Sequence, residues 1–241
     1  FKISENLLKF LLKNKLISEN FIDKSNKNEK IIKEFKSIDI KKGFYKAGEK
    51  FLFSNLDLKI KKGEKLFISG PSGSGKTTLI NIICGITKLY KGTYKINSYN
   101  FIDIKNFNGL FTICSQNPII LNRSIKENII LNKKFDKKYF DYVVKVVDLN
   151  KIFTKGRNIN SKISPDTLNF SGGEKQRISI ARALYHIKPI LIMDEATNGL
   201  DEKSENKIIK EIIHKYKKNT VIYISHNQNL KDNFTKKLLL E

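Results

Sequence analysis

The sequence predicts an α/β fold with a mainly parallel central sheet, an antiparallel β subdomain and a helical subdomain. Short apolar runs rich in Ile, Leu, Phe and Val alternate with stretches of helical period, and Gly, Pro, Asn or Ser bounds each run. Nearly continuous apolar runs are typical of strands that are buried on both faces, as in a parallel sheet with helices around it. The runs that fit this description are 65–69, 110–114, 190–193 and 220–225.

The chain begins with a segment that we expect to be separate from the main domain. Apolar residues between Ile3 and Ile22 recur close to a helical period, which predicts one or two amphipathic helices. Residues 23–30 are wholly polar and predict a linker. We therefore expect residues 1–30 to form a helical segment with a linker and residues 31–241 to form the main domain.

Two further regions differ in pattern from the buried strands. Residues 38–60 alternate between apolar and polar and contain two glycines, which favours an antiparallel β subdomain. Residues 124–157 have a helical period, and Ser124 with Glu127 fits a capping box at its start. This stretch is the predicted helical subdomain.

Composition limits the classes of function. The 241 residues are 40% hydrophobic and 29% charged, which excludes a generally disordered chain, and no apolar run approaches the roughly 20 residues of a membrane helix. A net charge of +22 is typical of proteins that bind nucleic acid or anionic lipid. However, only four of the 46 cations are Arg, the residue that makes bidentate contacts with bases. Because the charge is also spread evenly along the chain, we attribute it to compositional bias and expect no specific nucleic-acid partner.

A glycine-rich segment follows the predicted strand 65–69 and opens a predicted helix. It contains the full GxxxxGK[ST] pattern, which in this context indicates a phosphate-binding loop. Glycines allow consecutive backbone N–H groups to point at a phosphate, and the helix N-terminus adds the positive end of its dipole. Lys76 would bridge the β- and γ-phosphates of ATP, and the Thr77 hydroxyl would bind Mg²⁺. The candidate ATP-binding residues here are Gly70, Pro71, Ser72, Gly73, Ser74, Gly75, Lys76, Thr77 and Thr78.

Two carboxylates end the predicted strand 190–193. Ligands of open α/β sheets bind at the carboxyl ends of the strands, so we expect Asp194 and Glu195 beside the phosphates. Asp194 would hold Mg²⁺ through water, and Glu195 would polarise the water that attacks the γ-phosphate. A strand that ends in solvated acids is a common alternative interpretation.

The segment 170–177 has the sequence FSGGEKQR. Ser171 and Glu174 fit a capping box, so the simplest interpretation is the start of a helix. Two glycines in the first turn of a helix cost roughly 1 kcal/mol each relative to Ala, and a cap does not require them. We therefore expect Gly172 and Gly173 to expose backbone N–H groups to an anion.

Together these motifs resemble the nucleotide-binding domain of ABC ATPases over residues 38–230. The phosphate loop, the acidic strand and FSGGE, where the family usually has LSGGQ, follow one another in the family's order. The resemblance implies a P-loop NTPase fold, with Lys76 and Glu195 in catalysis. It also implies roles for Gln116 of the Q-loop (catalysis and metal binding), Asp201 of the D-loop 198–201 (nucleotide binding), the switch histidine His226 (catalysis) and Tyr45, which would stack on adenine.

The resemblance also implies partners. Two such domains would pack head to tail, with each ATP between the phosphate loop of one domain and Ser171, Gly172, Gly173 and Glu174 of the other. Residues 116–129 look like the exporter pattern, and residues 1–30 suit a junction with a preceding membrane domain. We therefore expect an Mg²⁺-dependent ATPase domain that powers transport of an unknown substrate from the cytoplasmic face of a membrane.

A soluble ABC ATPase that acts on ribosomes or nucleic acid is the alternative. Translation-type factors carry two such domains in one chain, and one is seen here. An SMC-type ATPase would insert a long coiled coil, whereas only 94 residues separate Lys76 from Ser171. A third class, a non-hydrolysing binding module, is disfavoured because Lys76, Asp194, Glu195 and His226 are all present.

Overall fold

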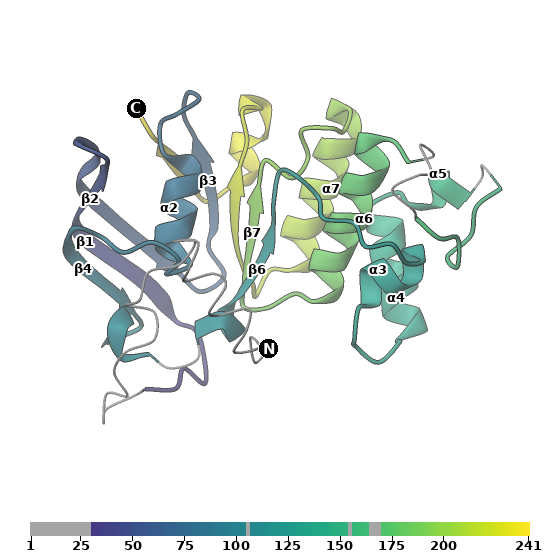
Figure 1. Cartoon of the computed structure of the whole chain (residues 1–241), viewed down its shortest axis with the longest axis horizontal. Coiled ribbons are helices and arrows are strands. Elements are labelled where there is room, and N and C mark those ends of the chain that lie inside the picture. The colour runs from purple at the N-terminus through teal and green to yellow at the C-terminus, as the bar shows by residue number, and fades with distance from the viewer. Residues whose placement is uncertain (1–29, 105–106, 154–155, 164–169) are drawn as a thin grey trace.

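The computed structural model describes residues 30–104, 107–153, 156–163 and 170–241, which form two sheets and a group of helices (Figure 1). The central sheet has the order β6-β7-β8-β3-β9, and each neighbouring pair of strands is parallel. Its strands are β3 (Lys65–Ser69), β6 (Phe111–Cys114), β7 (Ile190–Asp194), β8 (Thr220–Ile224) and β9 (Lys236–Leu239). The prediction of a mainly parallel central sheet is therefore confirmed.

Alternate side chains of these strands enter two separate hydrophobic clusters. Phe67 and Tyr223 belong to the cluster that includes α6 (Gly172–Tyr185) and α7 (Glu202–Lys215). Leu66, Ile68 and Ile222 belong to the other cluster, with α2 (Lys76–Ile83). In Figure 1, α2 lies between the central and antiparallel sheets, and α6 and α7 lie on the opposite side of the central sheet. Because both faces of the central sheet are covered, its inner strands appear in the sequence as nearly continuous apolar runs.

The antiparallel sheet has the order β2-β1-β4-β5 and confirms the predicted β subdomain. Its strands are β1 (Ser37–Ala47), β2 (Lys50–Lys61), β4 (Lys91–Ile96) and β5 (Tyr99–Asn100). The tip of the β1–β2 hairpin, at Gly48, has a φ of +64°. The pairing of β4 and β5 extends the subdomain beyond the predicted range 38–60.

The helical subdomain comprises α3 (Ile125–Ile130), α4 (Lys137–Val146) and α5 (Asn150–Phe153). The predicted capping box is present, because Ser124 accepts from the backbone N–H of Glu127 while the Glu127 side chain accepts from the backbone N–H of Ser124. Short 3₁₀ helices complete the fold at η2 (Phe101–Asp103), η3 (Phe107–Leu110) and η4 (Gln228–Asn233).

The predicted segment 1–30 lies outside the described residues except for Lys30, whose backbone N–H donates to the Asp103 carbonyl. Within the described ranges, no helix has the length and apolar character needed to cross a membrane.

Candidate functional site

The phosphate loop connects β3 to α2 and requires glycine for its path. Gly75 caps the N-terminus of α2 at a φ of +90°, in the left-handed region that other residues rarely adopt. A Cβ at this position would lie 2.8 Å from side-chain atoms of Leu52 and Phe53, so the β1–β2 hairpin packs directly against the loop. Lys76 is buried, and its ammonium group donates to the carbonyls of Gly70 and Pro71 at 2.9 Å each.

The phosphate loop is hydrogen-bonded to Asp194, the first of the two predicted acids. The Thr77 hydroxyl donates to Asp194 Oδ2 across 3.3 Å, which joins the start of α2 to the end of β7. Burial raises the pKa of the Asp194 carboxyl, the nearby Glu195 charge raises it further, and the Thr77 hydrogen bond and the Lys76 charge oppose the rise. A hydroxyl and a carboxylate held together in this way are the oxygen ligands that Mg²⁺ prefers.

Glu195 is held by side chains from three different loops. Its Oε2 accepts from Gln116 Nε2 at 2.9 Å and from Asn198 Nδ2 at 2.8 Å, and its Oε1 lies 3.0 Å from His226 Nε2. Its backbone has a φ of +49° and donates its N–H to the Ile224 carbonyl. A positive φ is rare for a residue other than glycine and is typical of functional positions.

These groups open onto one cavity of about 680 Å³. It is lined by Ala47, Leu52, Ser72, Gly73, Gly75, Lys76, Thr77, Thr78, Gln116, Glu195, Asn198 and His226. The structure therefore brings together the predicted phosphate loop, Gln116, Glu195 and His226. Asp194 adjoins the cavity through Thr77.

The residues present fit a magnesium nucleotide. The buried hydroxyl of Ser74, inside the phosphate loop, has no hydrogen-bond partner among the described residues. Lys76 and the glycine loop offer positive charge and N–H donors for phosphates, and Thr77 with Asp194 offers oxygen ligands for Mg²⁺.

Tyr45 lies at the edge of this arrangement. Its half-buried ring packs 6.4 Å from the ring of Phe53, centroid to centroid, and Phe53 in turn contacts the phosphate loop at Gly75. The ring thus lies on the sheet face that adjoins the loop, but Tyr45 does not line the cavity as the described residues form it. Adenine stacking by Tyr45 stays a prediction.

The FSGGE segment forms the N-terminus of α6, outside the cavity described above. Ser171 and Glu174 form the expected capping box, and Glu174 also pairs with Arg157 at 3.3 Å. A Cβ on Gly172 would meet no atom within 4 Å, whereas one on Gly173 would lie 2.8 Å from the Gly199 carbonyl oxygen. A side chain at position 173 would therefore clash with the turn at Gly199, whereas one at position 172 would meet open space. Contact of the Gly172 and Gly173 N–H groups with an anion stays a prediction.

Asp201 caps α7 and is likewise outside the cavity. Its carboxylate accepts from the backbone N–H of Ser204 at 2.9 Å and lies 3.8 Å from the Arg177 guanidinium. The hydrogen bonds from Ser204 lower the pKa of the Asp201 carboxyl. This geometry gives Asp201 a structural role, and its contact with nucleotide stays a prediction.

Asn198 opens the predicted D-loop 198–201, but the sequence analysis gave it no role in the site. It follows Glu195 by three residues in a turn, with its backbone N–H 3.2 Å from the Glu195 carbonyl oxygen. That turn brings its amide onto the carboxylate. The sequence signals for it are the D-loop match and a polar residue three positions after a predicted catalytic acid.

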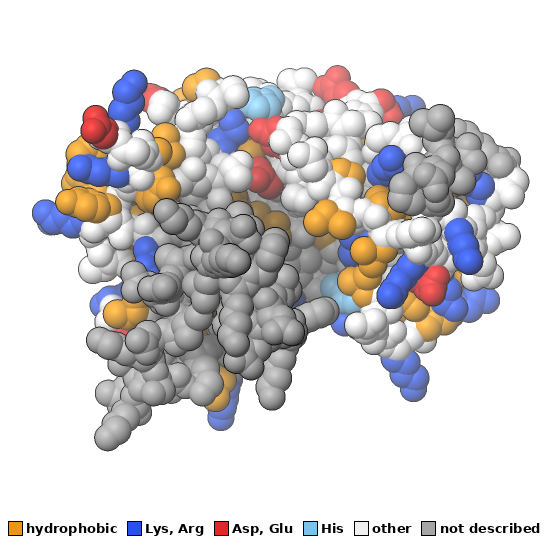
Figure 2. Space-filling model, in the orientation of Figure 1, with side chains coloured by type: hydrophobic (Ala, Val, Ile, Leu, Met, Phe, Trp, Pro, Cys, Tyr) orange, Lys and Arg blue, Asp and Glu red, His pale blue; other side chains and the backbone are white. Residues whose placement is uncertain are grey.

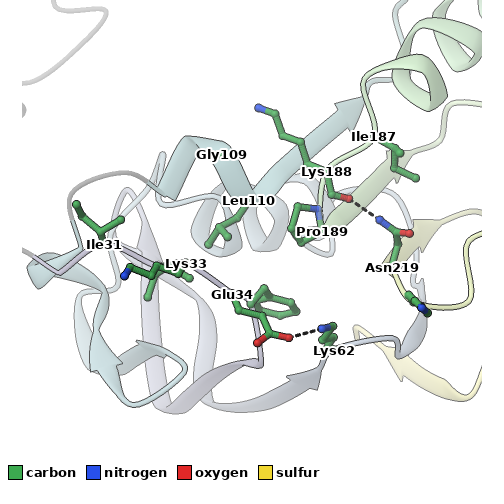
Figure 3. Close-up of a pocket in the computed structure, with 13 residues that line it drawn as sticks. Ile31, Lys33, Glu34, Lys62, Gly109, Leu110, Ile187, Lys188, Pro189 and Asn219 are labelled. Atoms are coloured by element: carbon green, nitrogen blue, oxygen red, sulfur yellow. Dashed lines mark hydrogen bonds and ion pairs between the residues drawn. The ribbon is translucent and has the colours of Figure 1, made fainter. Parts of the chain in front are cut away.

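A second cavity of about 490 Å³ lies at the opposite ends of the parallel strands (Figure 3). Leu110, Pro189 and Asn219, which line it, each directly precede β6, β7 or β8. Glu34 and Lys62 form an ion pair at its rim. None of the predicted site residues lines this cavity, which agrees with ligand binding at the carboxyl ends of strands.

The sequence profile of the family described as ABC transporter matches residues 53–198, which include the phosphate loop, the acidic strand and FSGGE. The chain belongs to the ABC transporter family. This result confirms the resemblance found in the sequence, and it identifies the chain as an ABC transporter ATP-binding domain.

Curated relatives of this ABC transporter domain differ in what their names say they transport. The multidrug resistance-like ATP-binding protein MdlA of Buchnera aphidicola is 37% identical over 190 residues, which cover 76% of this chain and 32% of the relative. The ATP-dependent lipid A-core flippase of Polaromonas is 31% identical, with coverage of 80% and 33%. The lactococcin-A transport/processing protein of Lactococcus lactis is 36% identical, with coverage of 76% and 26%. The chain thus spans about a third or less of the length of these relatives.

Among solved structures, a bacterial Atm1-family ABC exporter with ATP bound matches with a TM-score of 0.83. The match covers 98% of this chain and 42% of that one at 21% sequence identity, which shows the fold. The P-loop NTPase architecture predicted for this ABC transporter domain is confirmed.

Proposed function

We propose that this domain binds ATP with Mg²⁺, hydrolyses it, and powers export through a transmembrane domain. The observation that carries the proposal is the Glu195 carboxylate, which Gln116, Asn198 and His226 hold at the cavity that Lys76 and Thr77 also line. A carboxylate fixed beside a phosphate loop is positioned to orient and polarise a water molecule.

The remaining residues have distinct roles in this proposal. Lys76 exchanges its two carbonyl partners for phosphate oxygens, and the loop N–H groups orient the phosphates. Thr77, Asp194 and Gln116 hold Mg²⁺, which when bound neutralises phosphate charge. His226, in contact with Glu195, keeps the carboxylate oriented.

The second half of the nucleotide site comes from another copy of such a domain, packed head to tail. Ser171 and Gly172 are exposed, and the N-terminus of α6 carries two backbone N–H donors and the positive end of a helix dipole. These residues do not line the cavity of their own chain, so a phosphate bound there meets them only on a partner. Light scattering tests the arrangement: the Glu195→Gln protein with ATP and Mg²⁺ should give twice the 27.9 kDa monomer mass, because it holds ATP without turning it over, and ADP or an added Ser171→Arg should give the monomer.

A transmembrane domain, in the same or another chain, completes the proposed transporter, with the ATPase domain at the cytoplasmic face. The aligned residues cover only 26–33% of these relatives, which leaves room for such a domain in them. Their names specify different cargo, so the cargo is not proposed. In Figure 2, Lys and Arg side chains lie among other side-chain types on the uncovered part of this face.

Phosphate release by the purified chain tests the proposal. The parent should release phosphate from ATP only with Mg²⁺, and Lys76→Ala should lower the rate by about a hundredfold because it removes a charge aimed at the phosphates. Lys203→Ala, which removes an exposed lysine of α7, should match the parent. A Lys76→Ala protein with the parental rate would contradict the proposed site.

A further inference from the structure

A buried hydrogen-bond cluster joins the segments that carry Glu195 and His226. It consists of Thr197, Glu205, Tyr223 and Asn227, and we call it the Glu205 cluster. Thr197 and Tyr223 are at most 1% exposed, and Glu205 is 6% exposed. The proposed chemistry does not use any of these residues.

The Glu205 carboxylate, on α7, is the acceptor at the centre of the cluster. Its Oε1 accepts from Thr197 Oγ1 at 2.6 Å and from the Tyr223 hydroxyl, and its Oε2 accepts from Asn227 Nδ2 at 2.8 Å. The Thr197 and Tyr223 hydroxyls also contact each other at 2.7 Å. Burying a carboxylate costs free energy unless its oxygens accept hydrogen bonds. Because moving a donor away would incur that cost, the Glu205 carboxylate also holds its three donors in place.

Two of the donors are neighbours in sequence of the catalytic side chains. Thr197 stands two residues after Glu195, in the turn that also places Asn198 on the carboxylate. Asn227 directly follows His226. Glu205 thus binds both segments on the side that faces the core. On the side that faces the cavity, Glu195 Oε1 and His226 Nε2 lie 3.0 Å apart.

We propose that Glu205 is a positioning residue for ATP hydrolysis, which keeps the Glu195 turn and the His226 segment in fixed relation. The inference rests on the proposed function. Glu205 itself touches neither the nucleotide cavity nor Glu195, as far as the described residues show. Its effect is on the orientation of the carboxylate and the imidazole, and a small error in such an orientation reduces turnover strongly.

A donor–acceptor exchange tests the role of the Glu205–Asn227 hydrogen bond. Glu205→Gln leaves one carbonyl oxygen at position 205, so its NH2 group must face either the Asn227 amide or the Thr197 and Tyr223 hydroxyls, which lose their acceptor. Asn227 Oδ1 already accepts from the backbone N–H of Asn229 at 3.1 Å. Asn227→Asp places two carboxylates against each other. The double variant restores one donor and one acceptor, because the amide introduced at position 205 can donate to the carboxylate introduced at position 227.

A matched control lies on the same helix. Glu202 also accepts from an asparagine amide, Asn229 Nδ2 at 2.9 Å, but it is exposed and its partner does not adjoin a catalytic residue. Glu202→Gln therefore repeats the substitution and the type of hydrogen bond without the proposed connection. We expect its turnover to equal that of the parent.

The expected kinetic result is a loss in kcat with little change in KM. Each single variant should lower kcat by about tenfold to a hundredfold, with KM within about twofold of the parent, and the double variant should recover most of the loss. Melting temperatures identify any variant that fails to fold. Folded single variants with parental kcat, or a folded double variant no better than the worse single variant, would overturn the proposal.

Histidine NMR provides a readout that does not depend on hydrolysis. The chain has three histidines, so the ring resonance of His226 can be assigned by its loss in His226→Gln. Glu205→Gln should shift this resonance, the double variant should return it to the parental position, and Glu202→Gln should leave it unchanged. A His226 resonance unchanged in Glu205→Gln would overturn the proposal. A parent that shows this NMR pattern but no ATPase activity would instead contradict the proposed function.

Discussion

At the scale of single residues, hydrogen bonds within the chain hold the charged side chains of the site. Lys76 donates to backbone carbonyls, and Glu195 Oε2 accepts from both Gln116 and Asn198. A phosphate that contacts Lys76 must therefore replace its carbonyl partners, whereas the buried Ser74 hydroxyl has no partner among the described residues to give up.

Asp194 gives a prediction for the pH dependence of stability. Because burial raises its pKa, the carboxyl binds a proton more tightly in the folded than in the unfolded chain, and the ligand-free fold loses stability as pH rises from the ordinary Asp range through the folded pKa. Asp194→Asn lacks this titration and can still accept from Thr77. The variant should unfold at higher denaturant concentration than the parent at pH 7, and at equal concentration below about pH 3.9, the ordinary pKa of Asp.

The same variant should lose the stabilisation that ATP with Mg²⁺ gives to the parent, because a metal ligand is gone. Melting curves at pH 7, with and without ATP and Mg²⁺, measure both effects. A ligand-free Asp194→Asn protein less stable than the parent would contradict the assigned burial cost.

Tyr45 gives a prediction for nucleotide affinity. Stacking of its ring on adenine would contribute about 1 kcal/mol, so Tyr45→Ala should weaken ATP binding several-fold and Tyr45→Phe should not. Calorimetric titration with ATP measures both variants, and equal affinity in Tyr45→Ala and the parent would exclude the stacking role. Phe44 or Phe51, which pack against each other, would then be the next candidate.

At the scale of elements, the two glycines at the start of α6 differ in what packs against them. Gly173→Ala would force a Cβ to within 2.8 Å of the Gly199 carbonyl oxygen, a backbone atom, and should lower the free energy of unfolding by about 1–3 kcal/mol. Gly172→Ala meets no atom within 4 Å and should be neutral or raise stability by up to about 1 kcal/mol.

Denaturant unfolding of the two variants measures this difference. If Gly172 faces the phosphate of a partner, Gly172→Ala should lower ATPase activity in spite of its intact stability. Equal stability losses in both variants would show that the packing of α6 on the 198–201 turn does not distinguish the two positions.

At the scale of the whole molecule, burial decides what the sequence could predict. The sequence predicts the strands β3, β7 and β8 because both faces of the central sheet are covered there, so the central residues of each of these strands are apolar. The edge strand β9 was not predicted, since its Lys-Lys-Leu-Leu sequence is only partly buried. Likewise, the phosphate loop and acids follow from local motifs. The Asn198 contact depends instead on the shape of the turn after Glu195, and the Glu205 cluster depends on tertiary contacts between α7 and the segment after β8.

The hydrolysis rate of Glu195→Gln tests the central claim most directly. Glutamine keeps the shape of the side chain but removes the charge that polarises the attacking water, so ATP binding should survive while phosphate release falls by at least about a hundredfold. Phosphate release measured at saturating ATP and Mg²⁺, with ATP affinity measured on the same protein, separates the two effects. A Glu195→Gln protein that binds ATP and hydrolyses it at the parental rate would contradict the account.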